Sequence, residues 1–370
     1  MIGHYTRIGG HAPAADILTP LAVFCGGRRG RGTPESFRAL QRLVELVPDD
    51  AVFQADLAIS LLDEARKASS PSPDPQIRRE AERALASAEA LDPAIPEVAF
   101  ARYQFAMLNQ RPLSEQEMFL RSGLDRRPKT AGASWGYQLN LGYLGLLLNW
   151  TGRFDAAMPY LEMASDADPF SLARRSEYVR ALVYRESVGV ADEIARIDAR
   201  WGSESTEEIH LIASVISGAG HAADGPEAPP RSASSDRTAC GTAVDAALQP
   251  MRSRSEPSGA TEIKACLTSG RLSEEAGLLL LVKLGDLDGA FELAASPAFR
   301  PQETPGFGRD GLTDVLFRGP TRAIRADPRF LPLMERLGLM DYWRATNSRP
   351  DICADESVEV CSALRQAAPR

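Results

Sequence analysis

Four prolines each follow a segment in which small and apolar residues recur at helical spacing; they are Pro48, Pro93, Pro128 and Pro169. The clearest copy ends at Pro169 and reads Leu141-x2-Leu144-Gly145-x2-Leu148, then Ala157-x3-Leu161-x2-Ala164. Repeats of about 34 residues with this skeleton are typical of helical hairpins that stack into a solenoid. The repeat therefore predicts an all-α fold, and no other feature of the chain constrains its architecture as strongly.

Weaker copies of the same pattern precede the other three prolines. They comprise Ala81, Leu85 and Ala88 before Pro93, Gln116, Leu120 and Gly123 before Pro128, and Ser36, Leu40 and Leu43 before Pro48. The copy before Pro93 carries an insertion, Lys67 to Ile77, whose prolines exclude a continuous helix. The hairpins are therefore expected to vary in length along the chain.

Individual positions of the clear copy have mechanical roles. Gly145 and Ala157 are small, so the two helices of the hairpin are expected to approach closely where these residues face each other. Gly152 follows the first helix and suits the left-handed backbone that ends a helix. The seam between hairpins is expected to be filled by Leu144, Leu148 and Leu161.

The spacing of this skeleton resembles that of the tetratricopeptide repeat (TPR), with leucines where that family usually has aromatic residues. The resemblance implies a right-handed α-solenoid of TPR-like helical hairpins that binds an unknown protein or peptide partner. Asn149 and Trp150 end the first helix of the clear copy, and their offsets turn toward the concave side. We expect them to contact the partner, because tryptophan often anchors interfaces. The alternative, in which Trp150 packs against the next hairpin, stays open.

The C-terminal part carries a second helical pattern. Asp327-Pro328 predicts a helix start, an apolar stripe follows at Phe330, Leu331, Met334 and Leu337, and Gly338 predicts the end. Such an amphipathic helix is what a solenoid needs as a C-terminal capping helix.

The segments ADPRF, LGLMDYWR and PDIC within this part resemble bacterial membrane-tethered winged-helix regulators of the cadaverine-operon activator type, which carry a TPR-like sensory region. The resemblance covers Thr33 to Cys361 and implies a protein-protein interaction scaffold or sensory module. The alternative is a C-terminal fragment of a transcriptional regulator whose DNA-binding domain is missing from this chain. Because no winged helix or membrane segment precedes Thr33, we expect no direct nucleic-acid binding and no membrane span.

Composition divides the chain into five parts. We expect a flexible N-terminal tail over 1–32, a TPR-like solenoid over 33–216, and a low-complexity linker over 217–260 that contains a short candidate helix at 241–248. Helical hairpins with the cap follow over 261–346, and a tail over 347–370.

Charge and hydropathy exclude some classes of protein. A net charge of −8 argues against a general nucleic-acid binder. The hydrophobic share of 44% with 25% charged residues is typical of a folded globular chain. No apolar stretch approaches the roughly 20 residues that a bilayer requires, and the N-terminus lacks a signal-peptide pattern. A cytoplasmic location is expected by default, and a periplasmic one if the true N-terminus lies upstream.

The cysteines and histidines indicate no catalytic or metal site. Cys353 with Cys361, and Cys240 with Cys266, are candidate disulfides if the chain lies outside the cytoplasm, and reduced thiols are the alternative. The histidines are not spaced as metal ligands and adjoin no nucleophile motif; they are His4, His11, His210 and His221. The sequence therefore predicts no catalytic residue, metal site or cofactor, and a protein that is not an enzyme.

Overall fold

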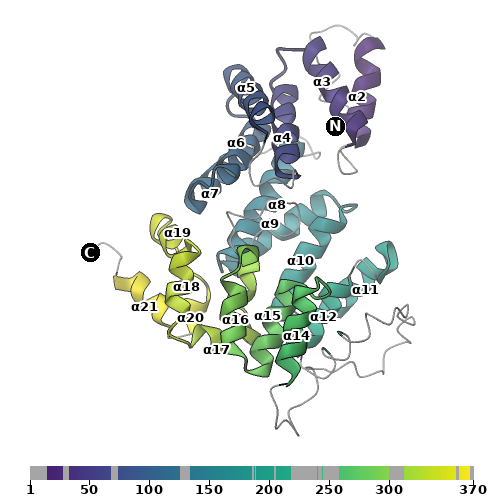
Figure 1. Ribbon diagram of the computed structural model, residues 1–370. Helices are drawn as coiled ribbons and strands as arrows, with labels where there is room; N and C mark the ends of the chain where they lie inside the picture. The colour runs from purple at the N-terminus through teal and green to yellow at the C-terminus, as the bar shows by residue number, and fades with distance from the viewer. Residues whose placement is uncertain are drawn as a thin grey trace. The chain divides into compact units, whose positions relative to one another are not determined.

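The computed structural model describes residues 15–27, 33–67, 74–125, 134–185, 187, 189–203, 206–217, 240, 244, 258–299, 312–355 and 358–366. Throughout these ranges the regular secondary structure is helical and no strand is present, so the all-α prediction is confirmed (Figure 1). The chain divides into two compact units, Met1–Leu144 and Gly145–Arg370, and each is described by itself.

The first unit consists of helices that pack on their neighbours in the chain. They are α2 (Ala15–Gly27), α3 (Pro34–Leu46), α4 (Ala51–Lys67), α5 (Pro75–Leu91), α6 (Pro96–Leu108) and α7 (Leu113–Ser122), and the boundary between the units falls within α8 (Trp135–Trp150). Helix α2 lies on α3, α4 on α5, and α6 on both α4 and α7 (Figure 1).

Prolines mark the starts of three of these helices. Helices α3, α5 and α6 each begin with a proline, where the missing N–H costs no helical hydrogen bond. Thr33 Oγ1 accepts a hydrogen bond from the backbone N–H of Ser36 (3.2 Å), and Asp74 Oδ1 accepts one from that of Gln76 (2.8 Å). These start signals are local in the sequence. Pro128, which was expected to end a copy, lies outside the described residues.

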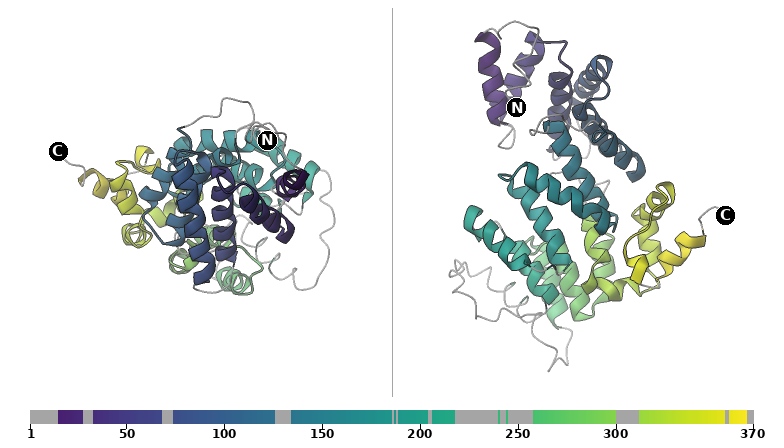
Figure 2. Two further views of the ribbon diagram at one scale, coloured as in Figure 1. Left: turned by 90° about the horizontal axis from the view of Figure 1, so that it is seen from above. Right: turned by 180° about the vertical axis from the view of Figure 1, so that it is seen from behind.

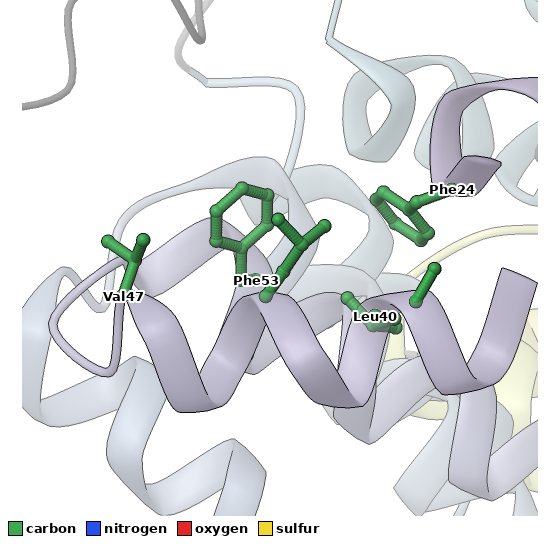
Figure 3. Packing of buried hydrophobic residues seen from close by; sticks show 6 residues of the cluster. Phe24, Leu40, Val47 and Phe53 are labelled. Carbon is green, nitrogen blue, oxygen red and sulfur yellow. The ribbon is translucent and has the colours of Figure 1, made fainter. Parts of the chain in front are cut away.

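The expected flexible tail over 1–32 contains α2, so that prediction is wrong for residues 15–27. Phe24 of α2 is only 4% exposed and belongs to one buried cluster with Leu40 of α3 and Phe53 of α4 (Figure 3). Ile17 and Leu21 line the same cluster. Burial of these side chains stabilises α2. The neighbouring residues are rich in Gly and Arg, and this composition favours a flexible tail over a helix.

The second unit continues from the end of α8. Its helices are α9 (Phe154–Ala167), α10 (Leu172–Tyr184), α11 (Val190–Trp201), α12 (Glu207–Ser217), α14 (Ser258–Thr268), α15 (Glu274–Leu284), α16 (Leu287–Ala294), α17 (Arg322–Arg325), α18 (Phe330–Arg336), α19 (Leu339–Ala345), α20 (Ile352–Asp355) and α21 (Glu359–Gln366). Short 3₁₀ turns occur at η2 (Pro297–Phe299), η3 (Leu312–Phe317) and η4 (Gly319–Thr321). Figure 2 shows this unit from two further sides.

The linker predicted over 217–260 lies mostly outside the described residues, including all of the candidate helix 241–248 except Val244. Helix α14 begins at the end of this linker and continues into the region over 261–346, where helical hairpins were predicted. It packs against α15 and buries Ile263 and Cys266, which lie on one helical face.

The C-terminal segment differs from the predicted tail over 347–370. The helix expected as a cap forms as α18, but it begins at Phe330 and not at Asp327-Pro328. Phe330, Met334 and the following Leu337 are buried as the stripe predicts, whereas Leu331 is only half-buried. Helix α18 is not the last helix, because Gly338 adopts a left-handed φ of 73° and α19 starts at once. Helix α21 then packs on both α18 and α19 and buries Leu364.

The crossing of α8 and α9 confirms that helices approach closely at Gly145, with a different partner. A Cβ atom at Gly145 would lie 2.8 Å from Leu161 Cδ2 and 3.1 Å from the Leu161 backbone nitrogen. The predicted face-to-face pairing of Gly145 with Ala157 is therefore wrong by one helical turn. Ala157 is nevertheless fully buried.

We expect Gly145→Leu to lower the free energy of unfolding by about 1–3 kcal/mol, since the new side chain would have to displace the α9 backbone. Urea unfolding measures this value. Gly259→Ala on α14 is the control, because its Cβ would meet Leu284 at an ordinary 3.5 Å. Gly259→Ala should not lower the free energy of unfolding. An unchanged midpoint for Gly145→Leu would contradict the α8–α9 crossing.

Candidate functional site

Asn149 and Trp150, which were expected to contact a partner, lie in the interior of the second unit. Their exposed fractions are 2% and 4%. Asn149 Nδ2 donates to Asp314 Oδ2 (2.9 Å), and Asn149 Oδ1 accepts from Arg318 Nη2 (2.7 Å). The backbone carbonyl of Trp150 accepts from Thr313 Oγ1 (2.7 Å). The expected partner-facing position is wrong for both residues, because their contacts belong to the same chain.

Arg318 occupies a closed box of aromatic and polar groups. Its Cζ lies 3.3 Å from the centroid of the Phe154 ring and 4.5 Å from that of Tyr184. Arg318 Nη2 lies 3.7 Å from Asp314 Oδ2, and the arginine side chain is only 3% exposed. Burial lowers the pKa of Arg318 to about 10, against the opposing attraction of Asp314. The guanidinium is thus a buried cation at neutral pH. We call Asn149, Phe154, Tyr184 and Asp314 the Arg318 box.

A second ionic group adjoins this box through Tyr184. Arg180 Nη1 donates to Glu275 Oε2 (2.9 Å) and Arg180 Nη2 to Glu177 Oε2 (2.6 Å), while the Tyr184 hydroxyl donates to Glu275 Oε1. Burial raises the pKa of Glu275 to about 7, although Arg180 opposes the shift. Helices α10 and α15 are therefore joined by hydrogen-bonded charges in the interior.

This constellation includes groups that acid–base catalysis uses, but its geometry is closed. Asp314, Arg318 and Glu275 are each at most 3% exposed, so they present no face to a substrate. The arrangement holds α8, α9, α10 and α15 to the segment that contains η3. Three buried atoms of these groups, Arg180 Nε, Asp314 Oδ1 and Arg318 Nε, have no hydrogen-bond partner among the described residues.

The turn after α8 is held by the C-terminal helices. Trp343 Nε1 donates a hydrogen bond to the backbone carbonyl of Thr151 (3.0 Å). The backbone N–H of Asp351 donates one to the backbone carbonyl of Gly152 (2.8 Å). Gly152 has the predicted left-handed backbone, with φ of 72°. A Cβ there would also lie 2.9 Å from Phe317, so close packing requires glycine in addition to the backbone conformation.

Both predicted cysteine pairs are joined in the structure. A disulfide between Cys353 and Cys361 links α20 to α21, with the two Cα atoms 5.4 Å apart. A second disulfide joins Cys240 to Cys266 of α14, with the Cα atoms 5.8 Å apart. Of the histidines, only His210 is described, and its Nε2 lies 2.9 Å from Asp198 Oδ2. No group of three or more His, Cys, Asp or Glu residues in the described ranges is placed to hold a metal ion. Of the helices described, none has the length and apolar character to cross a bilayer.

An open groove in the first unit was not anticipated from the sequence. It has a volume of about 240 Å³ and is lined by Gln41, Gln54, Leu57, Leu61, Glu80, Arg83, Ala84 and Ser87 of α3, α4 and α5. A neighbouring hollow of about 500 Å³ is lined by Arg79, Glu82, Arg83 and Ala86. We call the two together the α5 groove. The spacing of Arg79 and Arg83 by four residues on an exposed helix face was the signal that the sequence offered.

Comparison with known proteins finds no family model and no curated protein that matches this chain. The resemblances to TPR proteins and to membrane-tethered regulators therefore stay predictions.

The raised pKa of Glu275 has a consequence for stability. Its folded pKa of about 7 exceeds the ordinary 4.5, so the folded state binds the proton more tightly. This contribution to stability is fully present below pH 4.5 and is lost as the pH rises to about 7. Arg180, Tyr184, Asp314 and Glu208 are the groups that face Glu275.

We expect the unfolding free energy of the wild type, relative to that of Glu275→Gln, to fall over this pH range. The slope can reach about 1.4 kcal/mol per pH unit, the value for one proton. Urea unfolding of both proteins between pH 4 and 8 in one buffer system measures it. A difference that stays constant across that range would contradict the raised pKa.

Proposed function

We propose that the chain is a protein-interaction scaffold, a right-handed solenoid of TPR-like hairpins, which binds an acidic segment of a partner protein in the α5 groove. Consecutive helices pack on each other in both units, as hairpins of this kind require. Both hollows of the groove are open to solvent, unlike the concave pockets that bury most of a small molecule. An open surface of this kind is accessible to side chains of a peptide.

The observation that carries the proposal is the pair of exposed arginines, Arg79 and Arg83. Neither makes an ion pair with any residue that the structure describes, whereas Arg38 and Arg42 on α3 are paired with glutamates at 3.0 and 2.8 Å. Both unpaired guanidinium groups border the α5 groove. A carboxylate of a partner would form an ion pair with these guanidinium groups, since arginine binds carboxylates with a bidentate geometry.

The other groups of the groove are compatible with such a partner. Glu82 is already bound by Arg78 at 3.3 Å, and Glu80 accepts a hydrogen bond from Gln76. Leu57 and Leu61 of α4 supply an apolar floor. The fitting segment therefore combines acidic residues with an aliphatic side chain.

Selection of random peptides on the immobilised protein tests this function. We expect an enriched consensus of acidic and aliphatic residues. A labelled consensus peptide should lose about tenfold or more in affinity on Arg79→Glu/Arg83→Glu, measured by fluorescence anisotropy. Arg38→Glu/Arg42→Glu carries the same charge change on α3 and should bind as the wild type does.

Two results would overturn the proposal in different ways. If no peptide is enriched, the scaffold function fails. If a peptide is enriched but binds Arg79→Glu/Arg83→Glu unchanged, the binding surface is not the α5 groove.

A further inference from the structure

The Arg318 guanidinium is surrounded by groups that come from other parts of the chain. Asn149 is the penultimate residue of α8, Phe154 begins α9 and Tyr184 ends α10, whereas Arg318 directly follows η3. Asn149 and Arg318 are separated by 169 residues in sequence. The cation and the groups that hold it thus belong to two distant segments.

Each group of the box favours a planar cation. The rings of Phe154 and Tyr184 present their electron-rich faces within cation–π distance of Arg318 Cζ. Asn149 Oδ1 accepts a hydrogen bond at 2.7 Å from the guanidinium. The Tyr184 hydroxyl donates a hydrogen bond to Glu275. An ammonium group has neither the flat faces nor the forked donors that these partners match.

We infer that Asn149, Phe154 and Tyr184 form a binding site for an alkylguanidinium group, which the chain fills with its own Arg318. The segment over 312–321 carries this ligand and also contributes Asp314, which binds Asn149 Nδ2. The site belongs to the second unit and does not depend on the function proposed for the α5 groove.

Removal of the Arg318 side chain should leave a site that takes the same chemical group from solution. The probe is ethylguanidinium at millimolar concentration, far below the molar range in which guanidinium unfolds proteins. A ligand that binds only the folded state raises its melting temperature with concentration. We expect such a rise for Arg318→Ala, followed by far-ultraviolet circular dichroism, and none for the wild type, whose box is filled.

Three comparisons make the result specific. Ethylammonium carries the same charge without the planar fork, and it should give a smaller shift. Arg318→Met keeps an unbranched side chain in the box without a charge, so it should not respond to ethylguanidinium. Arg329→Ala removes an exposed arginine, paired with Asp327 and Asp288, and should not respond either.

The experiment also tests the inference in the case that Arg318→Ala does not fold in the absence of a ligand. The expected result is then recovery of its helical circular dichroism signal when ethylguanidinium is added, and not when ethylammonium is added. Absence of a response in the folded or unfolded variant, or an equal response in Arg329→Ala, would overturn the inference.

Discussion

Asp314→Ala is expected to lower the free energy of unfolding of the second unit by about 3–5 kcal/mol, because it leaves the buried cation of Arg318 without its carboxylate. Asp314 is fully buried, and its Oδ2 also binds Asn149. Both partners therefore lose a contact that water cannot replace. Urea unfolding followed by tryptophan fluorescence measures the loss.

Asp288→Ala is the matched control for this change. Asp288 pairs with Arg329 at 2.6 Å, but its side chain is 89% exposed. Exposed pairs contribute little, so the expected loss is below about 1 kcal/mol. Equal losses for Asp314→Ala and Asp288→Ala would show that the buried ion pair contributes no more to the free energy of unfolding than an exposed one.

A double-mutant cycle separates the pair from its surroundings. Asp314→Ala combined with Arg318→Met removes both charges and should destabilise less than Asp314→Ala alone, since no uncompensated cation remains. Additive losses would contradict a direct interaction between the two side chains.

Local chemistry explains what could be predicted from the sequence. Gly152 and Gly285 end helices in the left-handed conformation, as their places after apolar runs predict. The apolar spacing that predicts α18 also occurs in α21 at Val360, Cys361 and Leu364, within a segment whose polar composition favours a tail.

The polar network could not be predicted in the same way. Helical periodicity identifies a buried face by its apolar residues, whereas Asn149 and Asp314 are polar and buried. Their contact joins residues 165 positions apart, and no local pattern encodes such a distance. The prediction that Asn149 and Trp150 face a partner assumed that nothing of the same chain covers the end of α8. The segment over 312–321 covers it.

The α5 groove illustrates a further limit. Arg79 and Arg83 of α5 are visible in the sequence, but so are Arg78 of the same helix and Arg38 and Arg42 of α3. Only the side-chain geometry shows which guanidinium groups already have a glutamate. A candidate binding surface therefore depends on which charges are left unpaired after folding.

Trp343→Ala is expected to cost about 3–5 kcal/mol, the usual range for emptying a fully buried aromatic site. Trp343 is 1% exposed and packs edge-on against Phe317, with ring centroids 5.8 Å apart. Trp343→Phe should cost less, because it keeps most of the apolar volume and loses chiefly the hydrogen bond to the Thr151 carbonyl. Urea unfolding of both variants gives the two values.

Phe170→Ala is the control for loss of an aromatic ring, since Phe170 is 77% exposed, and it should cost below about 1 kcal/mol. If Trp343→Ala were equally mild, α19 could not be packed on the turn after α8. The C-terminal helices would then be an appendage of the second unit. A large loss would make them part of its core, because Trp343 and Phe317 together cover the turn at Gly152 where α8 ends.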